Sequence, residues 1–175
     1  MSIPTLTERF PWRYNMEAIV AVYSDWGIGC KGTQPVVLKA DRAHFRELTA
    51  GAAVIVGRRT LGDFPGGKPL KNRVNIVVTR QNIEIEGALV ANSEAQALEL
   101  ASQYPRTLVI GGASVYRNFM PYLDTVHVTK IELCPESDSF FDDLDASSEW
   151  ELADSSPAAE ENGIRYSFCT YKRIG

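Results

Sequence analysis

One carboxylate lies where the sequence pattern favours an apolar side chain. In the stretch PVVLKADRAHF, a helical repeat of about 3.6 residues places Leu38, Asp41, Phe45 and Leu48 on one face. Burying an unpaired carboxylate is costly and raises its pKa. Asp41 therefore needs either a basic partner, such as the neighbouring Arg42, or a function. Because Asp41 and Phe45 are one turn apart, a flat heterocycle would stack on the phenyl ring while the carboxylate binds its amino and ring N–H groups.

Three expected strand ends carry residues suited to binding phosphate. The apolar runs at 52–56, 74–78 and 107–110 are followed by GRRT, TR and GG, respectively. Glycine lets backbone N–H groups approach a phosphate closely, and arginine offers it two parallel hydrogen bonds. Each signal alone is typical of an ordinary turn or a solvated side chain, but together they predict a site for an extended ligand with more than one phosphate. Gly111 and Gly112, after the run at 107–110, are not followed by glycine at the spacing of the GxGxxG fingerprint, which disfavours an ordinary Rossmann domain.

Strands and helices alternate along most of the chain that must position these residues. The pattern predicts strands at 17–23, 52–56, 74–78, 88–91 and 107–110 and helices at 38–48, 93–104 and 114–123, the second beginning with a capping box of Ser93 and Gln96. Strands then follow at 126–133, 150–153 and 165–172, with the polar stretch SSPAAEENG as a turn region. We predict a three-layer α/β fold with a mainly parallel central sheet and an antiparallel C-terminal edge strand, and ligands beyond the carboxyl ends of the parallel strands.

Length and composition narrow the classes of protein. A chain of 175 residues with 45% hydrophobic residues predicts a single domain, placed at 17–175 after an N-terminal extension at 1–16. A net charge of −4 argues against a nucleic-acid-binding protein. Three cysteines without a CxxC pair predict neither a disulfide framework nor a metal site, and favour a reducing cytoplasm. No run approaches the length of a membrane span and no signal peptide is evident, so we expect a cytoplasmic monomer without membrane contact.

Taken in order, these residues resemble the dihydrofolate reductase family. The resemblance covers nearly the whole chain from Glu17 and rests on DWGIG at 25–29, on Pro35, Leu38, Asp41, Phe45 and Thr49, on GRRT at 57–60, on Pro69-Leu70 with Arg73, on Thr79-Arg80, on IGGASVY at 110–116 and on Thr129. It implies a dihydrofolate reductase-like fold and an NADPH-dependent reduction of 7,8-dihydrofolate to tetrahydrofolate, with antifolates as possible ligands. Hydride would pass to the pterin, and a proton would reach the adjacent ring nitrogen.

The resemblance also implies roles for individual residues. Asp41 would be the catalytic acid, binding the pterin amino group and promoting protonation through water, with Thr129 hydrogen-bonded to its carboxylate and Arg73 receiving the glutamate carboxylate of the substrate. The implied substrate-binding residues are Ile19, Ala21, Leu38, Asp41, Phe45, Phe64, Leu70, Arg73, Ile110, Tyr116 and Thr129. The implied cofactor-binding residues are Ala21, Ile28, Gly29, Gly57, Arg58, Arg59, Thr60, Val78, Thr79, Arg80, Ile110, Gly111, Gly112, Ala113, Ser114, Val115 and Tyr116, with a cis peptide at the Gly-Gly pair and no metal. The arginines favour NADPH over NADH.

Three positions near Asp41 depart from the family pattern. Val36 stands where the family commonly has tryptophan, Lys39 where it has proline, and Arg42 where it has an apolar residue. Arg42 would lower the pKa of Asp41 if the two side chains were close. Two other readings remain open: a related pyrimidine reductase of riboflavin synthesis, against which the acid on the first helix argues, and a non-catalytic pterin-binding or nucleotide-binding module.

Overall fold

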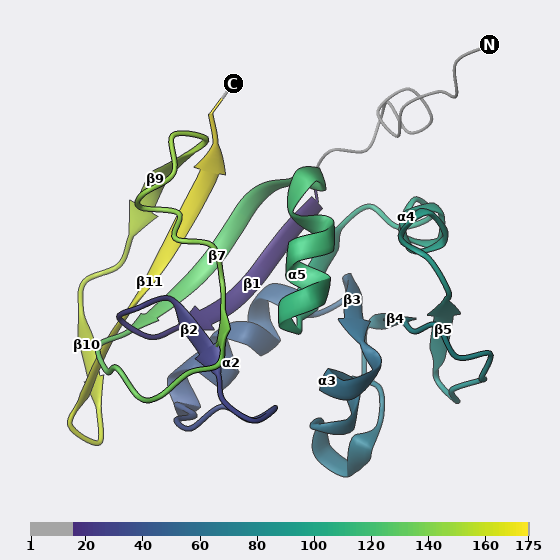
Figure 1. Ribbon diagram of the computed structural model, residues 1–175, viewed down its shortest axis with the longest axis horizontal. Coiled ribbons are helices and arrows are strands. Elements are labelled where there is room, and N and C mark those ends of the chain that lie inside the picture. The colour runs from purple at the N-terminus through teal and green to yellow at the C-terminus, as the bar shows by residue number, and fades with distance from the viewer. Residues whose placement is uncertain (1–15, 175) are drawn as a thin grey trace.

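A mixed sheet forms the centre of the computed structural model, which describes residues 16–174 (Figure 1). Its strands are β1 (Met16–Val22), β3 (Ala53–Gly57), β4 (Val74–Val78), β5 (Ala88–Ala91), β6 (Thr107–Gly111), β7 (Leu123–Ile131), β9 (Trp150–Ser155), β10 (Ala159–Glu161) and β11 (Ile164–Arg173). The helices are α2 (Lys39–Thr49), α3 (Arg58–Gly62), α4 (Glu94–Ala101) and α5 (Ala113–Phe119), with single 3₁₀ turns at Pro65–Gly67 and Met120–Tyr122. Two short strands, β2 (Gly27–Gly29) and β8 (Ser139–Phe140), form a separate pair.

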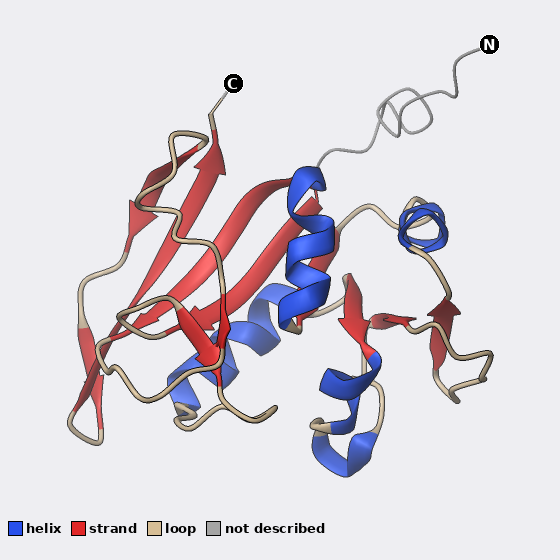
Figure 2. Ribbon diagram, in the orientation of Figure 1, coloured by secondary structure: helices blue, strands red, loops and turns tan. Residues whose placement is uncertain are grey.

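The strand order is β10-β11-β7-β1-β6-β3-β4-β5, with β9 also paired to β11. Pairing is parallel from β7 through β5, whereas β11 runs antiparallel to β7, β9 and β10. The predicted mainly parallel sheet is confirmed. Its antiparallel part is larger than the single edge strand expected, since it comprises three strands (Figure 2).

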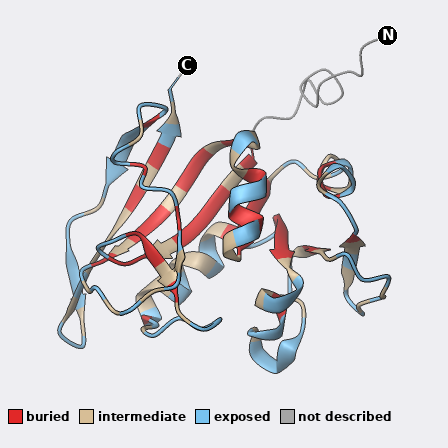
Figure 3. Cartoon of the chain, viewed as in Figure 1, coloured by how far each residue is buried: buried red, intermediate tan, exposed pale blue. Residues whose placement is uncertain are grey.

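Helices cover both faces of this sheet, giving the three layers predicted. Along β3, Ile55 packs in one apolar cluster with residues of α4 and α5, while Val54 and Val56 pack in another with Phe45 of α2. Alternate residues of a strand point to opposite faces, so a strand buried on both sides is apolar throughout. The buried residues accordingly concentrate in the central strands, and the outer helix faces are exposed (Figure 3).

The polar stretch expected to be a turn region contains a strand. Within SSPAAEENG, residues Ala159–Glu161 form β10 and pair with the start of β11. Asn162 and Gly163 connect the two strands with φ values of 51° and 81°. Positive φ at both central residues is typical of the type I′ turn, whose twist suits a two-residue hairpin. The composition signalled the turn but not the short strand in front of it.

Two helices end earlier than predicted because prolines follow them. α5 stops at Phe119 rather than at 123, and a 3₁₀ turn containing Pro121 continues the chain, since proline has no N–H for the next helical bond. α4 stops at Ala101 rather than at 104, four residues before Pro105, a residue that has no N–H to donate to the preceding turn. At its start, Ser93 Oγ accepts from Gln96 N at 3.1 Å as predicted, but the Gln96 side chain accepts from Asn92 N rather than from Ser93.

The predicted N-terminal extension at 1–16 lies outside the described residues except for Met16. That residue is buried and begins β1, so the first strand starts before the predicted domain boundary at 17. Among the described residues, no helix combines the length and apolar character that crossing a bilayer requires.

Candidate active site

Asp41 lies in the first turn of α2 and contacts β7 beneath it. Thr129 Oγ1 donates to Asp41 Oδ1 at 2.6 Å, although the two residues are 88 positions apart. Burial raises the pKa of Asp41 above its usual range, and Glu161 raises it further, against the opposing effects of the Thr129 hydrogen bond and His44. A carboxyl group that keeps its proton closer to neutral pH is suited to general acid catalysis.

The structure shows the environment of Arg42 and Val36, two of the positions near Asp41 that differ from the family pattern. Arg42 is exposed and is not among the groups that shift the pKa of Asp41, so the basic residue that acts on this carboxyl is His44. The His44 ring stacks on Phe168 of β11, with 4.0 Å between ring centroids. Val36 packs with Tyr23 and Leu38, and its backbone N–H donates to Tyr23 Oη at 3.1 Å.

The apolar residues implied for the substrate come together beside α2. One cluster contains buried Ile19 of β1 and Ile110 of β6. Phe45, Phe64 and Leu70 are partly buried and pack against the same cluster. Leu38 and Ala21 belong to a neighbouring cluster with Tyr23 and Ile131. The sheet thus brings residues from four separate segments to the face on which Asp41 lies.

Arg73 precedes β4 and lies near the end of α2. Its Nη1 donates to Thr49 Oγ1 at 3.3 Å and its Nε donates to Lys71 O at 3.0 Å. Burial lowers the pKa of Arg73, and the neighbouring Arg46 lowers it further, because two guanidinium groups in proximity repel one another. An anionic group would relieve this repulsion, so the position suits a carboxylate.

The ends of β3, β4 and β6, after which the sequence places the residues suited to binding phosphate, lie side by side. Gly57 of β3 pairs with Val78 of β4, and Val56 of β3 pairs with Gly111 of β6, so the residues that follow these strands emerge at one edge. The residues implied for the cofactor that this edge gathers are Gly57, Arg58, Arg59, Thr60, Val78, Thr79, Arg80, Ile110, Gly111, Gly112, Ala113, Ser114, Val115 and Tyr116.

The glycines at this edge make room between α3 and α5. A Cβ on Gly112 would lie 2.9 Å from Thr60 Oγ1, and one on Gly57 would lie 3.1 Å from Val115 Cγ2. The Gly111-Gly112 peptide is cis. The glycines therefore allow α3 and α5 to approach closely at the strand edge that Arg58, Arg59 and Arg80 follow in the chain, and glycine N–H groups and arginines are the groups that bind pyrophosphate.

Tyr116 links the substrate-side and cofactor-side residues. Its hydroxyl donates to Ile19 O at 2.7 Å, so α5 is fixed to β1 between the two groups of residues. Burial, together with the negative charge of Asp41, raises the pKa of Tyr116 well above its usual range. Tyr116 therefore stays a neutral donor.

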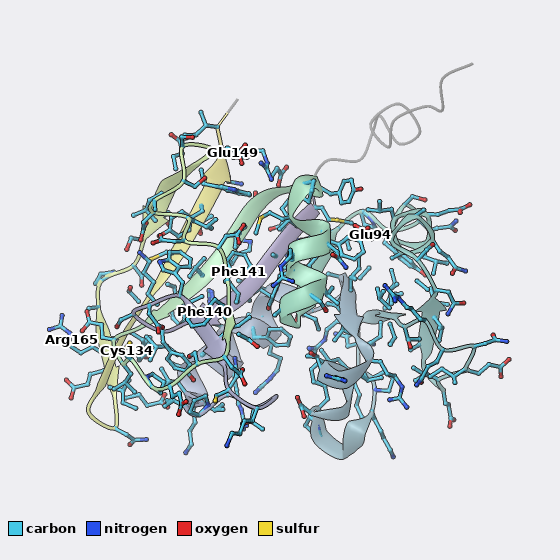
Figure 4. All side chains as sticks on the ribbon, viewed as in Figure 1. Glu94, Cys134, Phe140, Phe141, Glu149 and Arg165 are labelled. Atoms are coloured by element: carbon cyan, nitrogen blue, oxygen red, sulfur yellow. The ribbon has the colours of Figure 1, made fainter. Side chains whose placement is uncertain are left out.

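The loop that carries Ile28 and Gly29 is held by β8. Gly27 pairs with Phe140 and Gly29 with Ser139, and Asp138 N donates to Gly29 O at 3.0 Å. Phe140 is half exposed and Phe141, beside it in Figure 4, is buried against Trp26. The loop is thus anchored by Trp26 on one side and by the β2–β8 pair on the other.

Sequence reasoning missed five titratable groups on or near α2, namely Glu17, His44, Arg106, His127 and Glu161. Glu17 Oε2 accepts from Arg106 Nε at 2.7 Å, and Glu17 Oε1 lies 2.6 Å from His127 Nε2. Arg106 Nη1 also donates to Leu48 O in the last turn of α2. Glu161 contacts the first turn, as described below. His44 had a detectable signal, since it lies three residues after Asp41 on the same helix, whereas the other partners are remote in sequence.

The part of the chain that the structure describes contains no group of three His, Cys, Asp or Glu side chains arranged to hold a metal ion. The site combines one partly buried acid, an apolar surface and a basic, glycine-rich strand edge.

Known proteins share this architecture over most of its length. A sequence model described as dihydrofolate reductase matches residues 15–173. The chain is 36% identical to a dihydrofolate reductase from Bacillus subtilis over 83% of this chain and 87% of that protein, and 35% identical to one from Haemophilus influenzae over 77% and 82%. It also resembles a solved structure of dihydrofolate reductase from Enterococcus faecalis complexed with NADP(H) and RAB-propyl, with a TM-score of 0.84, 30% identity, and coverage of 93% of this chain and 98% of that one.

Proposed function

The chain belongs to the dihydrofolate reductase family, an NADPH-dependent class of oxidoreductases, and from this membership we propose that Asp41 is its catalytic acid and that the edge formed by β3, β4 and β6 holds NADPH. The reaction is the reduction of 7,8-dihydrofolate to tetrahydrofolate. The observation that carries the assignment is the partly buried Asp41, held by Thr129 beside an apolar surface.

Asp41 orients the substrate and holds a proton near it. Because Thr129 occupies Oδ1, we expect Oδ2 to face the pterin amino group and ring N–H. The raised pKa of Asp41, caused first by burial, favours the protonated form from which a water relays a proton to the ring nitrogen. Phe45, one turn further along α2, provides the aromatic surface for the pterin.

NADPH, when bound, supplies the hydride. The residues present fit this group because the glycines at 57, 111 and 112 and the arginines that follow β3 and β4 meet at one edge of the sheet. Arg58 and Arg80 would receive the 2′-phosphate, and residues 111–116 the pyrophosphate and nicotinamide side. Ile28 and Gly29 would cover the nicotinamide from the loop anchored by Trp26.

We expect Arg80→Ser to raise the KM for NADPH about ten- to a hundredfold while leaving the KM for NADH nearly unchanged, since one charge-assisted phosphate contact is lost. Steady-state kinetics with both cofactors measures this difference. Arg165→Ser, an exposed residue of β11 labelled in Figure 4, is the matched control. Equal affinity of the unmodified protein for NADH and NADPH would contradict the assignment.

We expect Arg73→Leu to raise the KM for dihydrofolate about ten- to a hundredfold with a smaller change in kcat, because the arginine binds the glutamate tail away from the reacting atoms. Lys71→Met, an exposed neighbour, should leave the KM unchanged. For a substrate analogue without the glutamate, the wild type and the Arg73 variant should have the same KM. A different KM for this analogue would show that Arg73 acts through something other than the glutamate tail.

The remaining proposals concern the state of the protein. We infer a single domain over 17–175, which is supported by one sheet that includes both β1 and β11. We also infer a monomer in a reducing cytoplasm, with antifolates as ligands. Within the described residues Cys30, Cys134 and Cys169 are free thiols, which agrees with a reducing compartment.

The decisive experiment is turnover by the purified protein. Loss of reduced-nicotinamide absorbance that depends on dihydrofolate and stops on adding an antifolate is the expected result. Turnover with a ribosylated pyrimidine in place of dihydrofolate would favour the riboflavin-pathway reductase. Binding of both ligands without turnover would favour a non-catalytic module.

A further inference from the structure

The first turn of α2 lacks a cap from its own sequence. Its N-cap residue, Leu38, makes no side-chain hydrogen bond to the helix, so the first N–H groups require other acceptors. Glu161 provides them from β10: its Oε2 accepts from Lys39 N at 2.7 Å and its Oε1 from Ala40 N at 3.0 Å. A proline at position 39 would have no N–H to donate. The carboxylate thus satisfies two consecutive donors directly before Asp41.

The hairpin that carries Glu161 is well placed to hold this contact. Glu161 pairs with Ile164 across the Asn162-Gly163 turn, so it sits at a fixed position of a two-residue hairpin. On β11, Phe168 pairs with Thr129 and stacks against His44 of α2. The β10–β11 hairpin therefore contacts the helix on both sides of Asp41 along the sequence, at Lys39 and Ala40 through Glu161 and at His44 through Phe168.

We propose that Glu161 is a positioning residue for Asp41: it caps the helix that carries this acid and places a second negative charge beside it. The cap fixes where the first turn of α2 begins, and therefore where the Asp41 side chain leaves the helix. The charge opposes ionisation of Asp41 and offsets the positive end of the helix dipole, which by itself would favour the carboxylate.

The charged groups around Asp41 show how this balance is set. Burial and Glu161 raise the pKa of Asp41, whereas the hydrogen bond from Thr129 and the charge of His44 lower it. Burial lowers the pKa of His44; among its charged neighbours, Asp41 and Glu47 raise that pKa and His127 lowers it. Asp41 also raises the pKa of Tyr23 and of Tyr116, after the larger effect of burial on both. Among the charged neighbours of Asp41, Glu161 thus favours its protonated form, whereas His44 favours its ionised form.

This proposal rests on the catalytic role of Asp41 given above, but its first test needs no turnover. The carboxyl carbon of Asp41 is titrated by ¹³C NMR in the wild type, in Glu161→Gln and in the control Glu160→Gln. Glu160 is the exposed neighbour of Glu161 on β10, so Glu160→Gln removes the same formal charge and serves as the matched control. The second measurement is the pH profile of single-turnover NADPH oxidation with dihydrofolate.

We expect Glu161→Gln to lower the titration midpoint of Asp41 by roughly 0.5 to 1 pH unit, while Glu160→Gln leaves it unchanged. Above the midpoint the single-turnover rate should fall about three- to tenfold, because a smaller fraction of Asp41 is protonated, with the rate at low pH retained. Glu161→Ala, which also removes both acceptors, should in addition speed amide hydrogen exchange at Lys39 and Ala40.

An Asp41 midpoint in Glu161→Gln equal to that of the wild type would overturn the proposal, whatever the activity. A rate loss of equal size at every pH would also overturn it, because a general loosening of the helix produces that pattern. Absence of dihydrofolate turnover in the wild type would instead contradict the proposed function, and the NMR titration would still decide the role of Glu161.

Discussion

Asp41→Asn is expected to reduce dihydrofolate turnover at neutral pH by about two to four orders of magnitude, the range typical of a lost general acid. Asparagine keeps an oxygen that accepts from Thr129, so the helix and the substrate-binding surface should persist. It cannot hold a transferable proton. The rate that remains should be nearly independent of pH in the range in which the wild type titrates, and stopped-flow measurement of NADPH oxidation across pH tests this.

The same substitution should stabilise the fold at neutral pH. Burial raises the pKa of Asp41, so the ionised carboxylate costs folding free energy at pH values above this pKa, and the cost disappears as the pH falls below it. Asparagine removes the cost. Urea unfolding at pH 8 should show a more stable variant, and the gain should shrink as the pH is lowered toward 3.8, the ordinary pKa of aspartate.

A matched control for both measurements is Asp154→Asn, because Asp154 is exposed on β9. It should alter neither the rate nor the pH dependence of stability. A variant at Asp41 that retained the wild-type rate and pH profile would refute the assignment of Asp41 as the proton-linked group.

The second large effect concerns stability rather than catalysis. Glu17→Gln should lower the free energy of unfolding at pH 7 by about 3 kcal/mol. Burial raises the pKa of Glu17, but hydrogen bonds and charge interactions with His127 and Arg106 outweigh it and lower the pKa from 4.5 to about 2. The Glu17 side chain is 15% exposed, so solvent screens these interactions little.

The pH dependence of this loss follows from the direction of the shift. A pKa lower in the folded than in the unfolded chain means that Glu17 stabilises the fold above pH 4.5 and loses that contribution as the pH falls toward 2. Unfolding in urea at pH 7 and at successively lower pH should therefore show the two proteins converging in stability. Glu151→Gln, on the exposed face of β9, should have little effect. A constant difference at all pH values would mean that packing, and not ionisation, accounts for the loss.

Much of the fold was predictable because its signals are local. The β4 and β5 bounds agree with the apolar runs at 74–78 and 88–91, and α2 begins one residue after its predicted start. Short apolar runs bounded by glycine or proline identify buried strands without knowledge of their partners. The errors arose where local composition misled: the polar residues before Asn162 form a strand because β11 supplies a partner, which composition does not record.

By itself, the sequence determined the alternating strand and helix pattern, the position of Asp41 on an apolar helical face and the basic, glycine-rich strand ends, since each depends on residues within a few positions of one another. Only the tertiary structure decided which groups act on Asp41. Its pKa depends on Thr129 and Glu161, and the cap from Glu161 reaches Lys39 across 122 residues. It also showed that Arg42, adjacent in sequence, takes no part in that balance. Desolvation and charge interactions depend on distance in space, and chain folding sets that distance independently of separation along the sequence.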